Sequence, residues 1–72
     1  MKQADVVYTA FGVWFYTNPV VVRTRMMVEF EKAGVPRATV RTWFYRKTVP
    51  RFKRVLIVEK ITRQEMATLF PY

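Results

Sequence analysis

A glycine in the middle of the chain separates two segments with helical periodicity, in the stretch AGVPRATVRTW at positions 33–43. Four apolar residues before it recur at helical steps and share one helix face: Val22, Met26, Phe30 and Ala33. After it, Val40, Trp43 and Lys47 fall on one side of a second helix. Because glycine reaches positive φ without a Cβ clash, Gly34 predicts a tight turn between two helices that pack together.

The N-terminal segments give a less uniform pattern. Asp5 is a candidate N-cap for a short helix that contains Val6, Val7, Ala10 and Phe11 and is closed by Gly12. Aromatic and β-branched residues at 13–25 favour a strand, whereas Asn18 followed by Pro19 favours the start of a helix. Both interpretations of this segment stay open.

The C-terminal part predicts two further helices. Phe52, then Val55 or Leu56, and then Glu59 or Lys60 have helical spacing after the break at Pro50, and Val58 and Ile61 add apolar surface. Thr62 and Glu65 form a capping-box pattern before Met66, Leu69 and Phe70, and Pro71 closes this element. We therefore expect an all-α bundle of about four to five helices, with an α+β alternative that has a short β-hairpin in 13–25.

Length and composition exclude several classes of protein. Seventy-two residues fit one domain, 1–72, and the chain has no cysteine and no histidine. This excludes disulfide scaffolds, thiol nucleophiles and zinc sites built on those ligands. The longest apolar stretch, AFGVWFY, is far shorter than the roughly 20 residues that span a bilayer. We expect a cytoplasmic protein with no membrane span.

The charge of the chain is strongly one-sided. Thirteen Lys and Arg oppose five Asp and Glu, a formal net charge of +8. No acidic residue interrupts a block of seven cations: Arg37, Arg41, Arg46, Lys47, Arg51, Lys53 and Arg54. A polyanion, most simply nucleic acid, is the expected partner.

The glycine turn and the basic block together predict a helix-turn-helix motif at about 26–45, with a recognition helix at about 36–46 in the major groove of DNA. The motif core is expected to consist of Phe30, Val35, Val40 and Trp43, with Gly34 in the turn. The residues expected to contact base edges are Arg37, Ala38, Arg41 and Thr42. The residues expected to contact phosphates are Arg46, Lys47, Arg51, Lys53 and Arg54.

The segments GVPRATVRTW, VPRF and IVEKITRQEM resemble the small helix-turn-helix regulators of phages and prophages, the Cro, CII and YdaS-like proteins. In that family a tryptophan late in the recognition helix precedes a valine and a proline, as Trp43, Val49 and Pro50 do here. A tail element similar to Thr62, Arg63 and Glu65 follows. The resemblance covers the C-terminal half and implies operator binding, usually as a homodimer in the cytoplasm and nucleoid of a bacterial host. The family usually has a small residue where this chain has Phe30.

Other interpretations of the sequence remain. The five carboxylates are scattered, and the chain has neither serine nor a phosphate loop, so we expect no enzyme, no catalytic residue, no cofactor and no metal. A small factor that binds a host protein through its basic and aromatic surface is the main alternative, which exposure of Phe44, Phe15 or Trp14 would favour. A nonspecific binder of membrane surfaces or polyanions is a third possibility, and aromatic rings that stack on single-stranded bases are a fourth.

Overall fold

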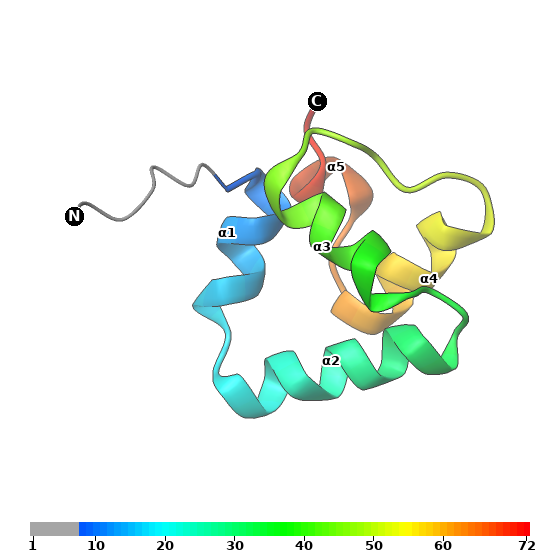
Figure 1. Cartoon of the computed structure of the whole chain (residues 1–72). Helices are drawn as coiled ribbons and strands as arrows, with labels where there is room; N and C mark the ends of the chain where they lie inside the picture. Colours follow the sequence, from blue (N-terminus) through cyan, green and yellow to red (C-terminus); the bar gives the residue numbers. More distant parts are fainter. Residues whose placement is uncertain (1–7) are drawn as a thin grey trace.

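The computed structural model describes residues 8–72, and every regular element within this range is a helix (Figure 1). The helices are α1 (Ala10–Thr17), α2 (Val20–Lys32), α3 (Arg37–Tyr45), α4 (Lys53–Thr62) and α5 (Met66–Leu69). The expected all-α bundle is confirmed. The β-hairpin alternative is wrong, because residues 13–25 form the end of α1 and the first half of α2.

The first helix differs from its sequence-based prediction at both ends. Its N-cap is Thr9, whose hydroxyl accepts a hydrogen bond from the Gly12 N–H at 3.1 Å. The helix continues through Gly12, so the prediction that this glycine closes it is wrong. Asp5, Val6 and Val7 of the predicted helix lie outside the described residues.

Asn18 and Pro19 separate α1 from α2. The Asn18 side-chain amide donates to the Trp14 carbonyl at 2.9 Å, and Pro19 is the N-cap of α2. The valines that follow favour strand by propensity, but burial of Met26 and Phe30 on one face of α2 outweighs that preference. Ala33, predicted on the same face, is exposed and ends the helix as its C-cap.

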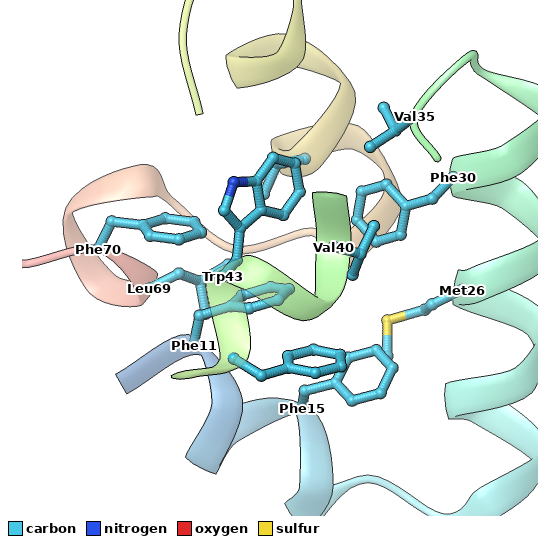
Figure 2. Packing of buried hydrophobic residues seen from close by; sticks show 11 residues of the cluster. Phe11, Phe15, Met26, Phe30, Val35, Val40, Trp43, Leu69 and Phe70 are labelled. Atoms are coloured by element: carbon cyan, nitrogen blue, oxygen red, sulfur yellow. The ribbon is translucent and has the colours of Figure 1, made fainter. Parts of the chain in front are cut away.

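The core joins all five helices (Figure 2). Helix α3 packs against α1 and α2, while α4 packs against α2 and α5, and α5 returns to α1. Trp43 of α3 lies at the centre, with its ring centroid 6.0 Å from those of Phe11 and Phe30 and 6.1 Å from that of Phe70. The buried apolar residues are Phe11, Phe15, Met26, Phe30, Val35, Val40, Trp43, Phe44, Val58, Leu69 and Phe70.

The predicted capping box at Thr62 and Glu65 is wrong in its detail. Thr62 lies in the last turn of α4, where its hydroxyl donates to the Val58 carbonyl at 2.7 Å. The first N–H of α5, that of Met66, instead donates to the Glu59 carboxylate at 3.2 Å. The cap of α5 therefore comes from the preceding helix, which local spacing does not reveal.

The apolar stripe predicted for α4 is also partly wrong. Val58 is fully buried, but Phe52 and Leu56 are 88% and 70% exposed. Phe52 precedes the helix and has a φ of 56°. The burial of Val58 and Thr62 turns the opposite face of α4, which carries Leu56, toward solvent.

Candidate nucleic-acid interface

The turn between α2 and α3 is defined by backbone hydrogen bonds. The N–H of Val35 donates to the Phe30 carbonyl at 2.9 Å, and the N–H of Gly34 donates to the Glu31 carbonyl at 3.0 Å. This is the Schellman arrangement, which requires a left-handed residue, and Gly34 has a φ of 90°. A Cβ on Gly34 would meet nothing within 4 Å. The glycine is therefore needed for its dihedral angle and not for space.

Helix α3 begins after Pro36 and is held by its apolar side. Val40, Trp43 and Phe44 are buried, and Phe30 and Val35 from α2 and the turn lie in the same core. The structure thus brings together the four residues predicted as the motif core. Lys47, predicted on this apolar side, instead lies beyond the end of α3 and is exposed, because the helix ends at Tyr45.

Thr9 anchors the C-terminal end of α3. Its N–H donates to the Phe44 carbonyl at 2.8 Å, and its hydroxyl donates to the Trp43 carbonyl. Carbonyls in the last turn of a helix lack partners within the helix, so α1 supplies them through its own N-cap residue. Helix α3 is therefore fixed at both ends, by the glycine turn and by Thr9.

The predicted base-contacting residues lie on the outward side of α3. Arg37, Ala38 and Arg41 are exposed. Thr42 is half-buried, and its hydroxyl donates to the Ala38 carbonyl at 2.9 Å. The three exposed residues thus form one continuous face, while the Thr42 hydroxyl is already bound within the helix.

The aromatic residues near this face divide into buried and exposed groups. Phe44 and Phe15 are buried and Trp14 is half-buried, so none of the three has the exposure that would favour a protein-binding factor. Tyr45, in contrast, is exposed beside Arg41 and its ring centroid lies 5.3 Å from that of Tyr8. Desolvation raises the pKa of Tyr8, and the charge and hydrogen bond of Tyr45 raise it further.

A hollow of about 330 Å³ adjoins this face, between the end of α1, α2 and α3. Arg23 of α2 lies on its wall together with Arg37 and Arg41, and none of the described residues that line it is acidic. The Arg23 guanidinium lies 5.1 Å from the centroid of the Tyr16 ring. Sequence analysis did not single out Arg23 or Tyr16, because a helix break separates them and no local pattern joins them.

The residues predicted to contact phosphates follow the C-terminus of α3. Arg46, Lys47 and Arg51 are exposed on the connection to α4, as is Lys53 at the start of α4. Arg54 is half-buried and lines a second hollow of about 510 Å³ against Trp43 and Pro50. Among residues 8–72, Arg25 and Glu29 form an ion pair at 4.0 Å. The five cations predicted to contact phosphates have no carboxylate partner in the same range.

Three apolar segments of the sequence could supply the contact of a homodimer: 20–22, 55–58 and 69–72. Leu69 and Phe70 are buried in the core of the same chain and are therefore not available. Val20 and Val21 are 63% and 79% exposed, and Leu56 is the outward residue of the second segment.

No family model, curated protein or solved structure matches this chain. Within residues 8–72, no helix is long and apolar enough to cross a membrane. In the same range, no three acidic, histidine or cysteine side chains form a group that could hold a metal ion.

Proposed function

We propose that the chain is a sequence-specific regulator of transcription that binds double-stranded operator DNA, of the phage or prophage helix-turn-helix type. The observation that carries the proposal is the exposed face of α3, which consists of Arg37, Ala38 and Arg41. Helix α3 is joined to α2 by a tight turn at Gly34. Arginine can bond two acceptors on a guanine edge, and an alanine methyl group can contact the thymine methyl. The helix enters the major groove by this face.

The remaining cations provide sequence-independent attraction. Residues 46–54 carry five Lys or Arg and no acidic residue, directly after α3. Such residues neutralise phosphates and release counterions, which makes binding sensitive to salt. Two copies would double the contact and place half-sites about one helical turn of DNA apart, so we propose a homodimer in the bacterial cytoplasm. Its contact uses Val20 and Val21, or Leu56.

Selection of bound fragments from a random duplex pool tests this function. The dissociation constants of the selected duplex and a scrambled duplex are then measured at two salt concentrations. We expect an enriched palindromic motif and a preference for it of about a thousandfold or more. Salt-sensitive binding to all duplexes with no enriched motif would contradict the proposal.

A protein-binding factor is the second candidate, favoured by one observation. Phe52, at the N-cap of α4, and Leu56, in its second turn, are both exposed, and Arg51 and Lys53 flank Phe52. Exposed apolar side chains in such a setting are typical of contacts with another protein. A stoichiometric protein partner that is lost with Leu56→Gln, combined with no binding to any duplex, would favour this candidate over DNA binding.

A further inference from the structure

We propose that the hollow between α1, α2 and α3 binds one phosphate of the DNA backbone, with Arg23 as its principal ligand. This inference rests on the proposed function and extends it to a helix that the recognition surface did not include. Arg23, Arg37 and Arg41 converge on this hollow from two helices. None of the residues of 8–72 that line the hollow is acidic, so the mutual repulsion of the three arginines is uncompensated there and an anion is the ligand that the site favours.

The state of Arg23 supports this assignment most directly. Its Nε is buried and has no hydrogen-bond partner within residues 8–72. Buried donors in folded proteins are nearly always paired, so Arg23 is a guanidinium whose hydrogen-bonding capacity is not fully used within the described residues. The Tyr16 ring, 5.1 Å from the guanidinium, orients the group by a cation–π contact that leaves its donors available. Arg23 lines the hollow, where its guanidinium would bind a phosphate oxygen in a charge-assisted hydrogen bond.

The position of the hollow gives this phosphate contact a function. Arg37 is the first residue of α3 and Arg41 lies at its middle, whereas residues 46–54 follow its C-terminus. A phosphate held at Arg23 would therefore give α3 a backbone contact at the end opposite to the basic connection. Phosphate contacts of this kind fix the register of a protein on the duplex without reading bases.

Arg23→Gln is the test, and Arg25→Gln is its matched control. Both remove one positive charge from α2, but Arg25 is exposed and paired with Glu29 at 4.0 Å. We expect Arg23→Gln to weaken binding to the selected and the scrambled duplex alike by about tenfold, and to lower the salt slope by about one. Arg25→Gln should change either affinity by less than about twofold. Equal effects of the two substitutions, or an altered sequence preference with Arg23→Gln, would overturn the site.

Two substitutions of Tyr16 test how Arg23 is held. Tyr16→Phe keeps the ring and should bind both duplexes as the wild type does. Tyr16→Leu removes the π face and should weaken both complexes by about threefold. Loss of affinity with Tyr16→Phe as large as with Tyr16→Leu would show that the ring does not act through Arg23. Thermal unfolding followed by circular dichroism selects variants that keep the wild-type fold.

Inorganic phosphate separates failure of the site from failure of the proposed function. In NMR spectra of the whole chain, phosphate should shift the Arg23 Nε–H signal more than that of Arg25. A chain that selects a duplex motif but shows no Arg23→Gln effect keeps the function and loses this site. A chain that selects no motif but shows the Arg23 shift keeps an anion site and loses the function. Absence of both effects overturns both proposals.

Discussion

The helix pair α2 and α3 and the connection that follows it both carry positive charge, but on different frameworks. In residues 20–45, Arg23, Arg37 and Arg41 project from helices whose opposite sides are buried in a shared core. In residues 46–52, the cations are exposed on a connection without regular structure. A side chain on an anchored helix starts from a fixed position, so the first region can discriminate between sites on a partner. The cations of the second region can attract a polyanion but cannot distinguish one sequence from another.

Two glycines maintain the framework of the first region for different reasons. Gly34 adopts a φ of 90° in open space. Gly12 lies in α1, and a Cβ there would stand 2.6 Å from the Phe44 carbonyl oxygen. One glycine supplies a backbone conformation, and the other allows α1 and α3 to approach closely. The predictions below test this contrast between the anchored and the unanchored region.

Gly12→Ala should have the largest effect. Helix propensity alone favours alanine by about 1 kcal/mol. The clash with backbone of α3 should reverse this sign and destabilise the fold by about 2 to 3 kcal/mol. Urea unfolding followed by circular dichroism measures the change, with Val13→Ala on the exposed side of α1 as control. Unchanged or increased stability of Gly12→Ala would contradict the close crossing of α1 and α3.

Arg41→Ala should distinguish sequence preference from sequence-independent affinity for DNA. We expect it to cost about 2 kcal/mol on the selected duplex and to relax preference at one base pair. Lys53→Ala, the comparison from the region after α3, should weaken the selected and scrambled duplexes equally and lower the salt slope by about one. Fluorescence anisotropy titrations at several salt concentrations measure both. An intact sequence preference in Arg41→Ala would show that the base-reading face lies elsewhere.

Gly34→Ala should have a smaller effect than Gly12→Ala. The space around Gly34 is open, so the cost is the positive φ alone, about 1 kcal/mol of folding free energy. Asparagine tolerates this region better, and Gly34→Asn should therefore cost less. The same unfolding experiment ranks the variants. A loss for Gly34→Ala that exceeds the loss for Gly12→Ala would reverse the contrast between the two glycines.

Phe52→Gly should have the smallest effect and the opposite sign. Phe52 has a φ of 56° and is 88% exposed, so it bears backbone strain while burying little surface. The Arg54 N–H donates to the Arg51 carbonyl at 3.0 Å, and Phe52 occupies the turn position that favours glycine. Glycine there should raise the free energy of unfolding by about 0.5 kcal/mol, after the entropy it adds to the unfolded chain. Phe52→Ala, which keeps the strain, should give no gain; equal gains would contradict relief of strain.

Features that depend on neighbouring residues could be predicted from the sequence. The end of α2 at Gly34 follows from glycine's access to positive φ. The buried side of α3 follows from the spacing of Val40 and Trp43. The start of α2 beside Pro19 follows from the fixed φ of proline, although β-branched neighbours left a strand open as an alternative. Periodicity and local dihedral preference depend only on residues close together in the sequence, so the sequence of a short segment is enough to predict them.

The amino-acid sequence by itself determined a +8 chain with helical periodicity and one obligatory turn. Only the tertiary structure showed why position 12, inside a helix, is a glycine. A Cβ there would clash with the carbonyl of Phe44, which lies far away along the chain. The tertiary structure also decided that Arg23 meets Arg37 and Arg41 in one hollow. Such meetings depend on how the apolar sides of α1, α2 and α3 pack into one core, and no spacing within a single helix encodes that arrangement.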